Sequence, residues 1–141
     1  MVGSIACDKS KYNTKPSLKL KNISSYVVPV NGSLVIDFDY TDKEGDISNL
    51  LVLKKQRMNK RTTATIRDSL GLNVPDIPKY KQGVVEANLS YQLHLVSALN
   101  PPTSGNPPKA EPDTLTLKFV LKDKANNDSD TLRIENVIIQ R

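Results

Sequence analysis

Acidic and amide side chains gather in two short polar segments of the chain, and such groups could hold a metal ion. The oxygen-bearing candidates are Asp42, Glu44 and Asp46 in the first segment and Asp123, Asn126 and Asp128 in the second. Carboxylate and amide oxygens are the ligands that calcium prefers in proteins. Neither segment has the spacing of an EF-hand, because no bidentate glutamate follows at the required distance. Aspartate, asparagine and glycine also form tight turns, so a calcium site and a pair of ordinary turns are both open interpretations.

A basic stretch without acids runs through the middle of the chain. The cations in it that could contact a polyanion are Lys54, Lys55, Arg57, Lys60 and Arg61. Such a stretch could meet phosphate, anionic lipid or acidic polysaccharide, and a solvated protein face is the alternative. Nucleic acid is not expected as a partner, because the stretch has no aromatic side chains on which bases could stack. A polyanion contact of this kind should weaken as salt is added.

The single cysteine of the chain, Cys7, lies close to the N-terminus, so no intrachain disulfide can form. Ser4, Ile5 and Ala6 before it resemble the end of a bacterial lipoprotein signal, in which a small residue precedes the cysteine that receives the lipid. Residues 1–17 are then expected to be a signal remnant and a flexible tether. A lipid on Cys7 beside basic residues would anchor the protein to a membrane. If the leader is missing from this sequence, the protein is expected outside the cytoplasm, at the outer membrane or cell surface. An ordinary free cysteine in a polar terminus is the alternative.

Catalytic chemistry has little support in the sequence. His94 is the only histidine, and the alternation around it places it on the polar face of a strand. No P-loop, dinucleotide-binding, zinc-binding or nucleophile-elbow motif is present. We therefore expect no enzymatic activity and no cofactor, apart from the calcium considered above.

The elements that must position these residues are predicted to be short strands. Apolar residues occupy every second position at 34–40, 85–95 and 115–121, with mostly polar residues between them, which indicates three strands with one face on a core. Weaker strands are predicted at 18–23 and 26–30, as a split first strand, and at 48–55, 61–66 and 131–140. The alternation of the last one changes phase near Asn136, as a β-bulge would cause. Asn31 and Gly32 form a dipeptide typical of hairpin turns, so a hairpin turn is predicted before the strand at 34–40.

Two longer connections complete the pattern. Residues 68–83 contain prolines, and one helical turn is predicted at 67–70. Residues 97–112 contain five prolines, which exclude a helix or a regular strand there. About seven short strands without a long helix predict a single all-β, antiparallel sandwich, and 141 residues suit one such domain.

Two turns resemble those of the immunoglobulin-like domains of bacterial surface lipoproteins. They are YTDKEGDI at 40–47 and LKDKANNDSDT at 121–131. Those domains often carry an aspartate- and glycine-bearing turn after the second strand and a D-x-A-x-N-x-S turn before the last. The resemblance implies that residues 18–141 form an immunoglobulin-like sandwich, used as an interaction or spacer module without a reaction. In that strand order the two acidic segments lie at one end of the sandwich and the basic stretch lies near the other.

Two functions follow from these expectations. The first is a non-enzymatic extracytoplasmic interaction or spacer module, anchored through Cys7, whose protein partner the sequence does not specify. The second is a module of the bacterial cell envelope that binds carbohydrate or another polyanion. Sugar sites usually present aromatic platforms, and this chain has no tryptophan to offer.

Overall fold

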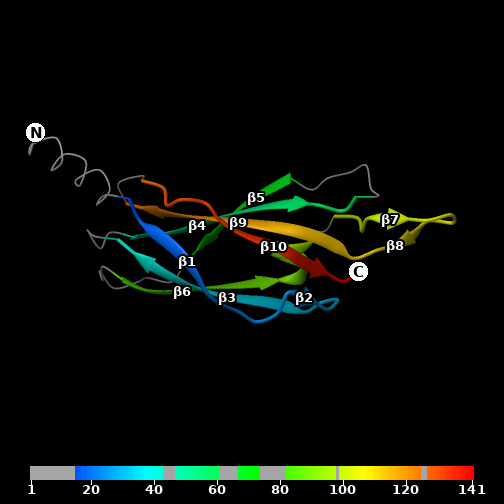
Figure 1. The fold of residues 1–141 in the computed structure, drawn as a ribbon, viewed down its shortest axis with the longest axis horizontal. Coiled ribbons are helices and arrows are strands. Elements are labelled where there is room, and N and C mark those ends of the chain that lie inside the picture. The colour runs from blue at the N-terminus through cyan, green and yellow to red at the C-terminus, as the bar shows by residue number, and fades with distance from the viewer. Residues whose placement is uncertain (1–14, 43–46, 61–66, 74–81, 98, 125–126) are drawn as a thin grey trace, which may run out of the picture.

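The computed structural model describes residues 15–42, 47–60, 67–73, 82–97, 99–124 and 127–141. Within these residues the protein is β-rich, and its strands form two main sheets that face each other (Figure 1). The three-stranded sheet has the order β1-β3-β6, with β1 (Ser17–Ile23), β3 (Ser33–Thr41) and β6 (Gln82–Ser90). The five-stranded sheet has the order β2-β10-β9-β4-β5, with β2 (Val27–Val28), β4 (Ile47–Arg57), β5 (Arg67–Asn73), β9 (Asp113–Asp123) and β10 (Leu132–Ile139). None of the described helical residues forms a segment with the length and hydropathy that crossing a membrane requires.

The first strand is split, as predicted, and its two parts belong to different sheets. β1 pairs antiparallel with β3, whereas β2 pairs with the end of β10. This second pairing is parallel, so the expectation of a wholly antiparallel sandwich was wrong at this edge. The reason is topological: the chain keeps its direction as it crosses from one sheet to the other, and there it meets a strand that runs the same way.

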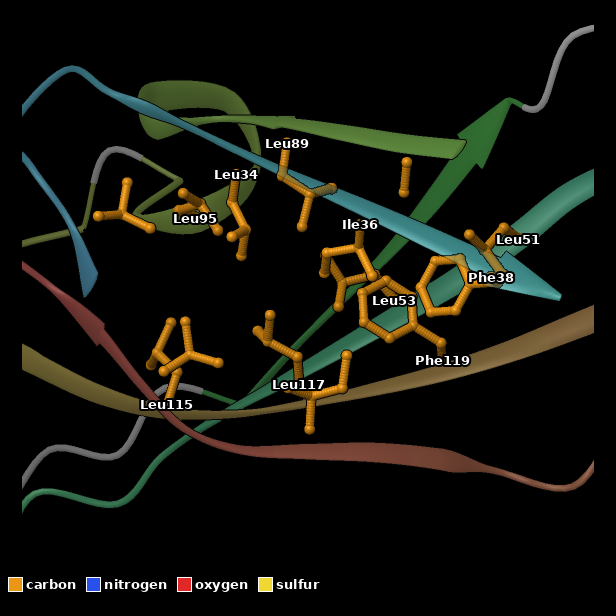
Figure 2. Packing of buried hydrophobic residues seen from close by; sticks show 14 of the residues in the cluster. Leu34, Ile36, Phe38, Leu51, Leu53, Leu89, Leu95, Leu115, Leu117 and Phe119 are labelled. Atoms are coloured by element: carbon orange, nitrogen blue, oxygen red, sulfur yellow. The ribbon is translucent and has the colours of Figure 1, made fainter. Parts of the chain in front are cut away.

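The core lies between the two sheets and is made of the alternating residues that the sequence indicates. From β3, the side chains of Leu34, Ile36, Phe38 and Tyr40 are buried, and those of Leu115, Leu117, Phe119 and Leu121 from β9 are buried opposite them. Figure 2 shows Leu34, Ile36 and Phe38 of β3 on one side of the core, with Leu115, Leu117 and Phe119 of β9 on the other. The rings of Phe38 and Phe119 meet across the layers, with centroids 4.8 Å apart and planes tilted by 57°. Apolar burial of this kind is the main favourable term in folding, so the alternation at 34–40 and 115–121 determines how the sheets face.

The third alternating segment does not remain a strand along its whole predicted length. β6 ends at Ser90, and Tyr91–Leu95 form the short helical turn η1, so the prediction of a strand to residue 95 was wrong. The side chain of Ser90 caps this turn by accepting a hydrogen bond from the backbone N–H of Leu93 at 3.3 Å. Leu93 is consequently 73% exposed, although Tyr91 and Leu95 stay buried. A local polar cap has overridden the period-two pattern here.

Two connections contain more strand than predicted. Residues 67–70 are the first part of β5 and not a helical turn, because they pair with β4 in antiparallel register. The proline-rich segment 97–112 contains a two-stranded ladder of β7 (Thr103–Ser104) and β8 (Lys109–Ala110), which extends beyond the end of the sandwich (Figure 1). The strand predicted at 61–66 lies outside the described residues.

One local prediction is confirmed, and a second holds only in part. The register of β10 against β9 shifts between Ile134 and Val137, and Asn136 between them has a φ of 59°. This is the bulge that the phase change indicates, since asparagine tolerates the left-handed region better than most residues. Asn31 has a φ of 60° and the N–H of Gly32 donates to the carbonyl of Pro29 at 2.9 Å. A tight turn therefore forms here, but it links the two sheets, so the prediction of a hairpin turn was wrong.

Candidate functional site

The described residues Asp42 and Asp123 of the two acidic segments lie at the same end of the sandwich. Asp42 directly follows the end of β3, and Asp123 ends β9, where it pairs with Ile47 at the start of β4. Both side chains are buried, at 1% and 2% exposure. Burial raises the pKa of the neighbouring Tyr40 hydroxyl, and the charge of Asp42 raises it further. The predicted partners Glu44, Asp46 and Asn126 lie outside the described residues.

Two of the described acids, Asp123 and Asp128, already have hydrogen-bond or ion-pair partners within the protein. The carboxylate of Asp123 accepts from the backbone N–H of Asn127 at 2.7 Å and from its side-chain amide at 3.0 Å. Asp128 pairs with Lys122 at 2.8 Å. Among the described residues no group of three or more histidine, cysteine or acidic side chains could hold a metal ion. These bonds account for Asp123 as a residue that shapes the turn between β9 and β10.

The calcium site stays a prediction that a titration can decide. A site made by the two acidic segments would bind calcium in the folded protein only, so millimolar calcium should raise the melting temperature. Thermal melting with calcium and with magnesium as the control measures this effect. A melting temperature that does not move would leave only the turn-forming role of these acids.

The basic stretch lies largely on β4, and its described cations divide into exposed and buried ones. Lys54 and Lys60 are exposed, but Lys55 and Arg57 are buried at 2% and 5% exposure. Their expected contact with a polyanion is therefore wrong for these two residues, because alternation along β4 turns them toward the interior. The fifth predicted contact, Arg61, lies outside the described residues.

The buried cations hold the proline-rich segment against the sandwich. Lys55 donates to the hydroxyl of Ser97 at 2.6 Å and to the carbonyl of Leu95 at 3.3 Å. Arg57 donates through Nε to Asp113 at 2.6 Å and through Nη2 to the carbonyl of Asn100 at 3.0 Å.

A second arginine completes this buried cluster. Nε of Arg141 lies 2.7 Å from the other carboxylate oxygen of Asp113, and its Nη2 donates to the carbonyl of Leu99 at 2.8 Å. One carboxylate thus pairs with two guanidinium groups, which are 5% and 7% exposed. The role of the cluster is structural, because each buried charge in it requires an opposite charge nearby.

The outer face of the five-stranded sheet carries a row of three cations, of which the sequence predicts only Lys54 as a polyanion contact. In the register of the sheet, Lys118 on β9 stands directly opposite Lys54 on β4 and opposite Arg133 on β10. Lys54 and Arg133 are exposed and Lys118 is half-buried. We call these three residues the cationic row. Like charges directly opposite each other on neighbouring strands destabilise a sheet, so this arrangement costs stability.

Among the side chains that the structure describes, one acid lies close to the cationic row. Arg133 also lies 3.6 Å from Glu135, with both side chains more than half exposed, so this ion pair contributes little. Beside the row, the half-buried Val52 and Val120 stand opposite each other. The face therefore offers a line of positive charge next to a small apolar strip.

His94 lines a cleft at the open edges of the two sheets. The cleft has a volume of about 270 Å³, and Glu86, Asn88 and Leu72 also line it. The backbone N–H of Ser90 donates to Nδ1 of His94 at 2.9 Å, so Nε2 is the nitrogen that carries hydrogen. The cleft is smaller than most small-molecule sites, and His94 serves the cap of η1.

A second, open hollow lies at the end of the sandwich near the C-terminal strand. It has a volume of about 450 Å³ and is lined by Val30, Tyr91, Val96, Leu99 and Pro101, among others. The hydroxyl of Tyr91 donates to the carbonyl of Gln140 at 2.6 Å, so the polar group of this ring is bound inside the domain.

Comparison with known proteins identifies no family. No protein-family model matches the chain, and no curated protein sequence matches it. A β-glucosidase from Listeria innocua is structurally similar, with a TM-score of 0.42 and 10% identity over 91% of this chain and 16% of that chain. A sporulation control protein from Bacillus subtilis gives a TM-score of 0.44 and 10% identity over 90% of this chain and 50% of that chain. This chain therefore spans half or less of the length of these structures, and it stands as a β-rich domain similar to parts of them.

Proposed function

We propose that this chain is a non-enzymatic immunoglobulin-like interaction and spacer module, held outside the cytoplasm by a lipid on Cys7. The observation that carries the proposal is the strand order. In immunoglobulin terms β3 and β6 correspond to strands B and E, while β10, β9 and β4 correspond to G, F and C. The passage of the first strand from one sheet to the other agrees with this assignment.

The core contact between β3 and β9 gives further support. Antibody domains join strands B and F by a disulfide across the sheets. In this chain, with its single cysteine, Phe38 and Phe119 make a ring contact between the two corresponding strands. An aromatic contact thus joins the same two strands that the disulfide joins in antibody domains.

The direction of the strands suits a spacer. Ser17, at the start of β1, pairs with Thr41 at the acidic end of the sandwich. Ile139, at the end of β10, pairs with Asp113 at the opposite end. A tether on residues 1–17 would therefore hold the far end of the domain, with its β7–β8 ladder, away from the membrane (Figure 1).

Mass spectrometry tests the lipid anchor, with Cys7→Ala as the matched variant. Expressed from its full genomic start in a bacterial host, the wild-type protein should carry a lipid on Cys7 and the variant should not. An unmodified cysteine with no cleaved leader would contradict the extracytoplasmic tether. The β-rich domain would then have to be placed elsewhere in the cell.

A further inference from the structure

We propose that the cationic row is a binding surface for a linear acidic polysaccharide, which lies across β4, β9 and β10. This inference goes beyond the interaction and spacer function and does not depend on a lipid at Cys7. It rests on the register that places Lys54, Lys118 and Arg133 in one line.

The geometry of the row suits an extended polymer. Neighbouring strands lie about 4.8 Å apart, so the backbones of the three residues span about 10 Å at right angles to the strands. Lys118 is half-buried and stands in the middle of the row, between Lys54 and Arg133. A chain with an acidic group on successive units can meet all three cations in this line.

The cost of the row argues for a bound anion. Three like charges at directly opposite positions repel one another, and an anionic ligand removes this repulsion when it binds. A nearby acid, Glu135, partly serves Arg133, but the pair is long and exposed. The ligand is therefore expected to gain more at Lys54 and Lys118 than at Arg133.

The neighbouring residues offer a sugar polymer an aliphatic contact in place of the usual aromatic platform. Val52 and Val120 form an apolar strip beside the row, which can contact the carbon-bearing face of a sugar ring. Of the described aromatic residues only Tyr26 is exposed, so the stacking that single-stranded nucleic acid needs is missing from this face. The valines are half-buried and do not protrude, as insertion into a bilayer would require.

The test measures binding of the full 141-residue chain to polygalacturonate, with neutral dextran as the reference polymer. The wild type should bind polygalacturonate, and the affinity should fall at least about tenfold as salt rises from about 50 to about 500 mM. Replacement of Lys54, Lys118 and Arg133 by glutamine together should weaken binding by about tenfold or more.

A matched variant separates the row from net charge. Lys19, Lys21 and Lys109 are exposed and lie outside the five-stranded sheet, and replacing them by glutamine removes the same charge. This control should bind within about twofold of wild type. The single change Lys118→Gln should give an intermediate loss, and it serves if the triple variant does not fold.

Four results would overturn the proposal: no binding to polygalacturonate, binding that salt does not weaken, equal weakening by both triple variants, or binding to phosphatidylglycerol vesicles alone. The last would make a membrane the occupant of this face. None of these results bears on the lipid at Cys7, so the two proposals fail separately.

Discussion

Replacing Asp113 by alanine is expected to lower the free energy of unfolding by about 3–5 kcal/mol. The carboxylate is 1% exposed and pairs with Arg57 at 2.6 Å and Arg141 at 2.7 Å. Its removal leaves two buried guanidinium groups without their anion, and their desolvation is then uncompensated. The same change should loosen the segment whose carbonyls at Leu99 and Asn100 those arginines hold.

Urea denaturation measures this loss, and Asp128→Ala is the matched control. Asp128 pairs with Lys122 at 2.8 Å, but the two side chains are 52% and 34% exposed. An exposed pair of this kind is worth less than about 1 kcal/mol. If the two alanine variants were equally stable, the buried cluster would not have the structural role assigned to it.

The second large effect is expected at the centre of the core. Phe119→Ala should cost about 3–5 kcal/mol, because a fully buried ring is replaced by a cavity that the two sheets cannot close. Phe119 and its partner Phe38 are both 0% exposed, and their rings lie 4.8 Å apart.

A double-mutant cycle with Phe38→Ala isolates the ring contact. The coupling free energy should be about 0.5–1.5 kcal/mol, as for other aromatic pairs. Val84→Ala serves as the control, since this side chain is 47% exposed on β6, and it should cost within about 0.5 kcal/mol. Additive losses at Phe38 and Phe119 would show that the contact between β3 and β9 adds nothing beyond burial.

The sequence predicts the core well where alternation is strict. At 34–40 and 115–121 every inward position is apolar. A strand with one buried face can cover these side chains in only one orientation, with that face toward the core. The bulge at Asn136 could also be predicted, because it leaves its mark as a change of phase. The end of β6 could not, since the alternation continues through Leu93 while a cap at Ser90 turns the backbone away.

The candidate site was harder to predict because it depends on register between distant strands. Lys54, Lys118 and Arg133 are separated in the chain, and only the pairing of β9 with β4 on one side and β10 on the other aligns them. In the sequence the basic stretch is the more obvious polyanion site, because its cations lie close together. Contiguity misleads in a strand, where neighbours face opposite sides, and it is why Lys55 and Arg57 turned out to be buried.

The most direct test of the binding surface is a map of where the ligand lies. The full chain, labelled with nitrogen-15, is titrated with a short galacturonate oligomer while the backbone amide signals are followed. We expect the largest shifts at Lys54, Lys118, Arg133 and the neighbouring Val52 and Val120, which share the outer face of the five-stranded sheet. Shifts concentrated on the three-stranded sheet or near Lys109, or no shifts at all, would contradict it.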